Sequence, residues 1–105
     1  MTTSGDEFVE TLLESGDIRI ERIISSGQVS PPGFWYDQDE DEWVALLEGN
    51  AELEYADERR VTMTRGDWIM IPAHCRHRIT HTDSYCVWLA VFVKNLPVGD
   101  NAELV

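Results

Sequence analysis

The fold class of this chain is decided by residues 66–81, GDWIMIPAHCRHRITH. The stretch opens on a Gly-Asp turn, continues as a short apolar run and is broken by Pro72. Beyond the break, His77, Ile79 and His81 fall on one face of an extended chain, because alternate residues of a strand point the same way. The stretch therefore predicts a strand, a turn and a second strand.

The same pattern extends to both sides of this stretch. Residues 43–47 form an apolar run that ends in a Glu-Gly-Asn turn, and residues 51–55 alternate between apolar and acidic side chains. Residues 18–25 alternate between isoleucine and polar side chains, whereas residues 85–93 are apolar on both faces, as expected of a central strand. Short strands separated by Gly- and Pro-containing turns predict an all-β sandwich or barrel.

The ends of the chain differ from the middle. We expect an N-terminal arm over residues 1–16, a β-barrel over residues 17–95 and a loose C-terminal tail over residues 96–105. The arm contains a short apolar cluster at helix-like spacing, formed by Phe8, Val9, Leu12 and Leu13. The arm is therefore predicted to be a short helical or irregular segment.

The charge balance restricts the partners. Lys and Arg total 8 against 20 Asp and Glu, for a formal net charge of −12. Such a chain repels phosphate backbones and anionic membranes, so neither nucleic acid nor a membrane is an expected partner. The acidity serves solubility or attracts cations. With no signal-peptide pattern and no apolar stretch of ~20 residues, the expected location is cytoplasmic.

The two cysteines, Cys75 and Cys86, are predicted to be reduced thiols that contribute to packing. A disulfide stays open on sequence grounds. Since Cys75 lies close to His74 and His77, a nucleophile or a soft metal ligand is the alternative.

Two spaced sets of residues resemble known motifs. Glu42 is followed by six residues and Gly49, and Gly66 is followed at fixed spacing by Pro72 and His77. These match the second half of the first cupin motif, G-x5-H-x-H-x3,4-E-x6-G, and most of the second, G-x5-P-x-G-x2-H-x3-N. The chain thus resembles small single-domain cupins. The resemblance implies a double-stranded β-helix, or jelly-roll, barrel.

The resemblance fails at the usual metal ligands. With three residues before the motif glutamate, the His-x-His positions hold Tyr36 and Gln38; with four, they hold Trp35 and Asp37. The final Asn of the second motif is His81. The family's three-histidine, one-carboxylate site is therefore not intact. Whether Asp37 or Gln38 points inward stays open, because a one-residue slip exchanges them.

A metal site can still be assembled from the donors that are present. The candidate ligands are Gln38, Glu42, His77 and His81, with Tyr36 or water completing the shell. The family resemblance places Glu42 and His77 on the inner face of the barrel. Mixed nitrogen and oxygen ligands suit Zn²⁺, Ni²⁺, Mn²⁺ or Fe²⁺. In the alternative interpretation, both residues are hydrogen-bonded core side chains without a metal.

These features favour a small cupin that binds a divalent metal, a small molecule or both in the barrel. If the protein is an enzyme, Tyr36 or His81 is the available general acid or base. The alternative is a non-catalytic protein that senses a small molecule, or a structural homodimer with a degenerate metal site.

The segment before the first motif glutamate has two possible roles. The aromatic residues 34–36 line the mouth of a pocket or cover the open end of the barrel. The acidic residues 37–42 form a solvated loop face, because burying five carboxylates is too costly, or a rim that guides cations.

A partner surface is also expected. If Glu42 faces inward with Val44 and Leu46, then Trp43 and Leu47 face outward. The apolar side chains of the last strand raise the same question: Cys86, Trp88 and Phe92. Exposed apolar sheet faces usually mark partner surfaces, and small cupins commonly pair through them, so a homodimer is predicted.

Overall fold

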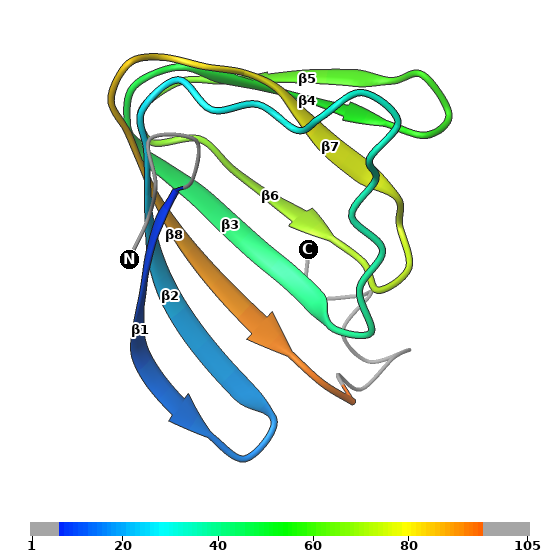
Figure 1. Ribbon diagram of the computed structural model, residues 1–105. Coiled ribbons are helices and arrows are strands. Elements are labelled where there is room, and N and C mark those ends of the chain that lie inside the picture. Colours follow the sequence, from blue (N-terminus) through cyan, green and yellow to red (C-terminus); the bar gives the residue numbers. More distant parts are fainter. Residues whose placement is uncertain (1–6, 96–105) are drawn as a thin grey trace.

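The computed structural model describes residues 7–95, in which eight strands form two antiparallel sheets (Figure 1). The strands are β1 (Phe8–Ser15), β2 (Ile18–Ser25), β3 (Asp41–Glu48), β4 (Ala51–Tyr55), β5 (Arg60–Met63), β6 (Trp68–Ile71), β7 (His77–Thr82) and β8 (Cys86–Val93). The larger sheet has the strand order β1-β2-β8-β3-β6, and the smaller has the order β5-β4-β7. The predicted all-β jelly-roll architecture is confirmed.

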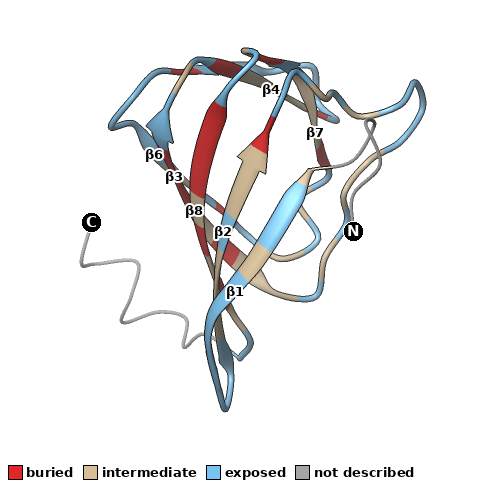
Figure 2. Ribbon diagram, turned by 60° about the vertical axis from the view of Figure 1, so that its left-hand side comes forward, coloured by how far each residue is buried: buried red, intermediate tan, exposed pale blue. Residues whose placement is uncertain are grey.

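The core lies between the two sheets and is built mainly by alternate residues of β3, β4 and β8, with Met63 of β5 and Ile71 of β6. Leu46 and Met63 are fully buried, and Leu53 is 2% exposed. Burying a side chain of this size contributes roughly 1.5–3 kcal/mol. Exposure is lowest on β8 in the middle of the large sheet and highest on β1 at its edge (Figure 2). Side chains at the sheet centre are therefore the ones that are held most firmly.

Gly49 makes the turn between β3 and β4 possible. Its φ of +89° is a conformation that side chains with a Cβ rarely adopt. A Cβ placed there would lie 2.5 Å from the carbonyl oxygen of Tyr85 and 2.7 Å from Sγ of Cys86. The Glu-x6-Gly spacing thus connects an inward-facing glutamate at one end of β3 to an obligatory tight turn at the other.

Residues 8–15 form strand β1, so the expectation of helical turns is wrong. β1 pairs with β2 in an antiparallel hairpin whose register places Phe8 opposite Ile24. The register shifts between Thr11 and Leu13, and such a bulge interrupts strict alternation. The interrupted alternation produced the helix-like spacing of the apolar residues.

The predicted C-terminal tail, residues 96–105, lies outside the described residues. Within residues 7–95, no helical segment has the length and hydropathy that a membrane span requires. Cys75 and Cys86 are both free thiols. Cys86 is buried, and its thiol donates to the carbonyl oxygen of Asn50 at 3.2 Å, which agrees with a packing role.

Candidate functional site

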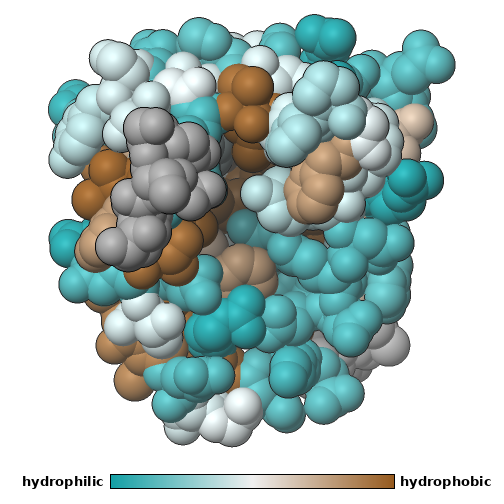
Figure 3. Space-filling view, in the orientation of Figure 1, coloured by the Kyte–Doolittle hydropathy of each residue, from teal (hydrophilic) through white to brown (hydrophobic). Residues whose placement is uncertain are grey.

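A cavity of about 350 Å³ lies between the two sheets. Side chains from both sheets and from the loop before β3 line it. Its walls are mainly aliphatic and aromatic, and polar groups enter from several elements. Figure 3 shows a hollow on this face of the molecule, with hydrophobic side chains in and beside it and hydrophilic ones over the surface below it. The family resemblance predicts an interior site at this place.

Glu42 enters the cavity from the middle of the large sheet. Its partners in register, Ile71 of β6 and Phe92 of β8, share its inward face. The residue is 8% exposed, and the side-chain amide of Gln38 donates to its Oε1 at 3.3 Å. Burial raises the pKa of Glu42 to about 7, against a smaller opposing effect of the Gln38 hydrogen bond. The carboxyl is therefore about half protonated at neutral pH.

His77 enters from β7 in the small sheet, and its side chain is 5% exposed. Its Nδ1 lies 2.9 Å from the carbonyl oxygen of Cys75. Since a carbonyl can only accept, we assign the proton to Nδ1, which leaves the Nε2 lone pair free. Burial lowers the pKa of His77, so the ring is neutral. Nε2 lies 3.9 Å from Oε1 of Glu42.

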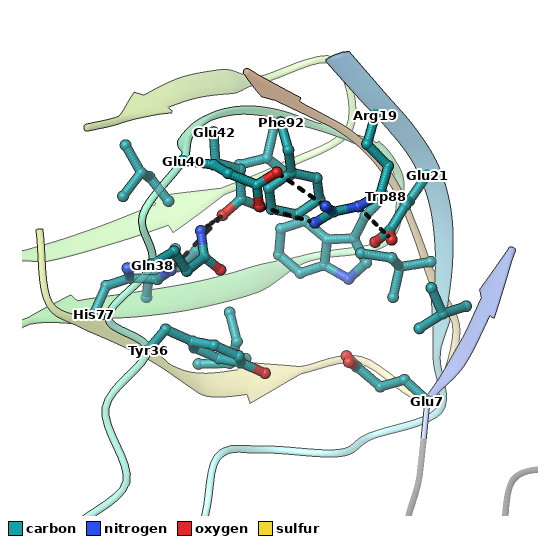
Figure 4. A pocket seen from close by; sticks show the side chains of 16 residues that line it. Glu7, Arg19, Glu21, Tyr36, Gln38, Glu40, Glu42, His77, Trp88 and Phe92 are labelled. Carbon is teal, nitrogen blue, oxygen red and sulfur yellow. Dashed lines mark hydrogen bonds and ion pairs between the residues drawn. The ribbon is translucent and has the colours of Figure 1, made fainter. Parts of the chain in front are cut away.

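Tyr36 is fixed beside His77 by backbone and ring contacts. The amide of Tyr36 donates to the carbonyl oxygen of His77 at 2.7 Å, and the reverse bond is 3.2 Å long. The two rings stack with centroids 5.3 Å apart. Burial raises the pKa of the phenol, and the charges of Glu7 and Glu42 raise it further. The neutral hydroxyl points across the cavity toward Glu7 (Figure 4).

The question of which loop residue faces inward is decided in favour of Gln38. Gln38 lines the cavity, whereas Asp37 is exposed and contacts Nδ1 of His74 at 2.8 Å. The aromatic cluster is likewise divided. Tyr36 lines the cavity, whereas the ring of Trp35 packs against the guanidinium groups of Arg76 and Arg78.

His81 does not reach the cavity. His81 and Ile79 pair with consecutive residues of β4, so β7 carries one inserted residue between them. Such a bulge reverses the facing of the residues beyond it. The side chain of His81 is 57% exposed, and its Nε2 lies 3.0 Å from Asp83. The expectation that His77 and His81 share one face is therefore wrong.

Three residues that the sequence pattern did not predict as site residues form a charged network at the cavity: Arg19, Glu21 and Glu40. The guanidinium of Arg19 donates twice to Glu40, at 2.9 and 3.1 Å, and once to Glu21 at 3.0 Å (Figure 4). It also lies 4.3 Å from the ring centre of Phe92. The alternation on β2 showed that Arg19 and Glu21 share a face, but not that this face is the inner one.

A second missed group is the carboxyl of Glu7. The indole nitrogen of Trp88 donates to Oγ of Ser25 at 3.1 Å, and Ser25 donates to Glu7 at 2.6 Å. Ser25 is fully buried. This chain of hydrogen bonds holds an acidic group opposite Tyr36 on the far wall of the cavity (Figure 4).

These residues do not fit the metal centre that the family resemblance implies. The predicted ligands that meet at the cavity supply one imidazole, one amide and one half-protonated carboxyl, with a phenol beside them. Amide and phenol oxygens are weak ligands at neutral pH. Among residues 7–95, no group of three or more His, Cys, Asp or Glu side chains is arranged to hold a metal ion. The amide nitrogen of Gln38 donates to Glu42, which leaves only the weakly ligating amide oxygen for a metal.

Comparison with known proteins gives a consistent picture. The family model described as Cupin domain matches residues 21–92. The chain is 49% identical to a Ralstonia eutropha JMP134 protein that carries the provisional description mannose-6-phosphate isomerase, over 87% of each chain, with a TM-score of 0.83. A cupin superfamily protein from Desulfitobacterium hafniense DCB-2 shares the fold at 18% identity, over 90% of this chain and 84% of that chain, with a TM-score of 0.76. No curated protein matches the chain.

Proposed function

This chain belongs to the cupin domain family, and from that membership we propose that it binds a small organic molecule between its two sheets. The observation that carries the proposal is the cavity, in which Glu42, His77 and Tyr36 converge between apolar walls. Concave apolar pockets with a few convergent polar groups are the usual form of small-molecule sites. Shifted pKa values in such a pocket support the same interpretation.

The polar groups suit a ligand with hydroxyl or amino groups. His77 offers an acceptor at Nε2, and Tyr36 offers a hydroxyl that donates or accepts. If the ligand is a substrate, Glu42 is the group best suited to give or take a proton, because its pKa of about 7 matches neutral pH. The description of the Ralstonia protein makes a hexose phosphate one ligand to test.

Organic-ligand binding has more support than binding of Zn²⁺, Ni²⁺, Mn²⁺ or Fe²⁺. The positions that supply two histidines in the family's first motif hold Tyr36 and Gln38. His81, the remaining nitrogen donor among the predicted ligands, is held outside by Asp83. The proposal therefore needs to be tested on protein from which metal has been removed.

The test is a ligand-observed NMR screen of small organic compounds, including mannose 6-phosphate, against EDTA-treated protein. The informative variant is Ile23→Trp, because Ile23 lines the cavity and a larger ring there would fill it. The matched control is Ile24→Trp, on the next residue of the same strand, which does not line the cavity. We expect hits that Ile23→Trp abolishes and Ile24→Trp retains.

The melting temperature of each variant shows whether it is folded. Hits that survive Ile23→Trp would place the binding site elsewhere and overturn the proposal. An absence of hits on the folded parent protein would favour a structural role. Hits that require added Zn²⁺ or Mn²⁺ would restore the metal hypothesis.

We also propose that a second copy of the chain covers the outer face of the large sheet. Register places Trp43, Met70 and Val91 side by side on that face, and Trp68 is 58% exposed there. The net charge of −12 opposes contact between other parts of two copies, whereas this apolar face meets its equivalent without repulsion. The oligomeric state in solution tests this.

A further inference from the structure

The charged side chains around the cavity are strongly unbalanced. Those that line it are the carboxyl groups of Glu7, Glu21, Glu40 and Glu42 and the guanidinium of Arg19. Among residues 7–95, no other Lys or Arg lines the cavity. A negatively charged ligand would therefore meet an excess of carboxyl groups in a partly desolvated space, where like charges repel strongly.

Arg19 is not available to balance such a ligand. Its guanidinium already donates to Glu40 through two nitrogens and to Glu21 through a third, and it lies over the ring of Phe92. An anion that recruited Arg19 would leave at least one of these carboxylates without its partner. Removing one partner of a poorly solvated ion pair is costly.

The hydrogen-bonding positions that stay open are mainly acceptors. The side chain of His77 is only 5% exposed, and its Nε2 forms no hydrogen bond within the described residues. Glu42 is bound by Gln38 through Oε1 only, and Glu7 faces the cavity from the opposite wall (Figure 4). Acceptors on two sides of one cavity are suited to a ligand group that donates several hydrogen bonds.

The rest of the wall favours an apolar body beside that donor group. Aliphatic side chains from both sheets line the cavity, with the indole of Trp88 among them. The indole nitrogen is fixed by Ser25, so the ring is held in place on the cavity wall. A cation near an indole face gains further stabilisation from the ring electrons.

We propose that the cavity selects a small organic cation, an amine on an apolar body, and rejects phosphorylated and carboxylated compounds. This inference rests on the proposed function, since it names the class of ligand for the same cavity. The ammonium group lies beside His77 and Glu42, Glu7 adds negative charge from the opposite wall, and the apolar body lies against Trp88 and the aliphatic wall. The preferred ligand thereby differs from the sugar phosphate named in the description of the Ralstonia protein.

The test compares three probes that share a ring and differ in charge: benzylamine, benzyl alcohol and phenyl phosphate. Affinity is measured by isothermal titration calorimetry on the EDTA-treated full chain, with Ile23→Trp as the blocked control. We expect benzylamine to bind at least about tenfold more tightly than benzyl alcohol, and phenyl phosphate to bind more weakly than both. Glu42→Gln should weaken benzylamine by about tenfold and leave benzyl alcohol nearly unchanged.

A matched control for nonspecific attraction is Glu10→Gln. Glu10 pairs with Arg22 at 2.6 Å and does not line the cavity, so its removal should not alter benzylamine binding. Cavity binding of phenyl phosphate or mannose 6-phosphate as tight as that of benzylamine would overturn the charge inference and keep the proposed function. If none of the three probes binds, the hits of the NMR screen that Ile23→Trp abolishes replace them: cationic hits support the charge inference, and anionic hits overturn it. If no hit depends on the cavity, both the proposed function and the charge inference are refuted.

Discussion

Each face of the large sheet departs in one respect from the arrangement expected of a barrel wall. On the inner face, Arg19, Glu21 and Glu42 stand among apolar residues and surround the cavity. On the outer face, Trp43 and Val91 belong to rows that are largely apolar. An antiparallel sheet usually buries its apolar face and exposes its polar one.

These two departures have separate causes. Polar groups inside a barrel cost free energy unless they are paired, so their presence indicates a site. Arg19 is paired with Glu21 and Glu40, and Glu42 takes up a proton more readily because it is buried. An apolar outer face costs less when a second copy covers it. The proposed ligand site and the proposed dimer account for one departure each.

The comparison is tested most strongly at adjacent residues of β8. Phe92 is 6% exposed on the inner face, and its ring contacts the guanidinium of Arg19. Val91 is half-buried on the outer face. Phe92→Ala should lower the free energy of unfolding by about 4 kcal/mol, through lost burial and the cavity that remains. Val91→Ala should cost about 1 kcal/mol. Urea denaturation at one protein concentration measures both, and equal losses would show that the outer face is as firmly covered as the core.

Glu42 gives the next largest effect, and its sign depends on pH. Its pKa rises from 4.5 to about 7 on folding, so the folded state holds the proton more tightly and loses stability as pH rises between these values. At pH 8 this shift costs about 3 kcal/mol. Glu42→Gln should therefore stabilise the protein by up to about 3 kcal/mol at pH 8 and have little effect at pH 4.5.

Denaturation of this variant across the pH range checks the prediction. Glu10→Gln on the edge strand is the control, because the Glu10 side chain is 40% exposed, and it should change the free energy of unfolding by less than about 1 kcal/mol. A gain of equal size at both pH values would mean that the carboxyl is not kept protonated by burial.

On the outer face, the expected effect concerns association rather than folding. Trp68→Ala removes an exposed ring that contacts Trp43 with centroids 5.9 Å apart. Loss of a tryptophan at the centre of an interface typically costs about 2 kcal/mol, which raises the dimer dissociation constant about 30-fold. Sedimentation equilibrium measures this constant. Phe34→Ala, at an exposed aromatic residue of the loop before β3, should leave it unchanged, and a monomeric parent protein would remove the predicted dimer altogether.

The fold was predictable because its strongest signals are local. Gly49 is required because the backbone of Tyr85 approaches it closely. The spacing from Glu42 to Gly49 corresponds to the length of strand β3. The alternation of apolar and polar side chains on β2 showed which of its residues share a face. It could not show which face is inward, because that depends on packing against the other sheet.

The site was predictable only where strand periodicity is unbroken. Glu42 and His77 were predicted from the resemblance to the cupin motifs, and both line the cavity. His81 was misplaced because a bulge in β7 inserts one residue, and nothing in the local sequence marks it. The bulge in β1 caused the same kind of error at the N-terminus. Glu7 and Arg19 were not predicted, because the partners Ser25 and Glu40 lie 18 and 21 residues away from them in the sequence.

The smallest expected effect compares two arginines on opposite faces of β2. Arg19 is 28% exposed and paired with two carboxylates that are themselves 13% and 16% exposed. Arg22 is 47% exposed and paired with Glu10. Arg19→Met should cost about 2 kcal/mol at pH 8, since it leaves poorly solvated carboxylates unpaired. Arg22→Met should cost under about 1 kcal/mol, as is usual for surface ion pairs.

Salt sharpens this last comparison. Denaturation at low and high ionic strength is the measurement, because screening weakens exposed pairs more than buried ones. The loss for Arg22→Met should therefore shrink more at high salt than the loss for Arg19→Met. If the two variants lose equal stability at pH 8, the inner charges are as well solvated as the outer ones. The cavity would then lack the desolvation on which its preference for a cation depends.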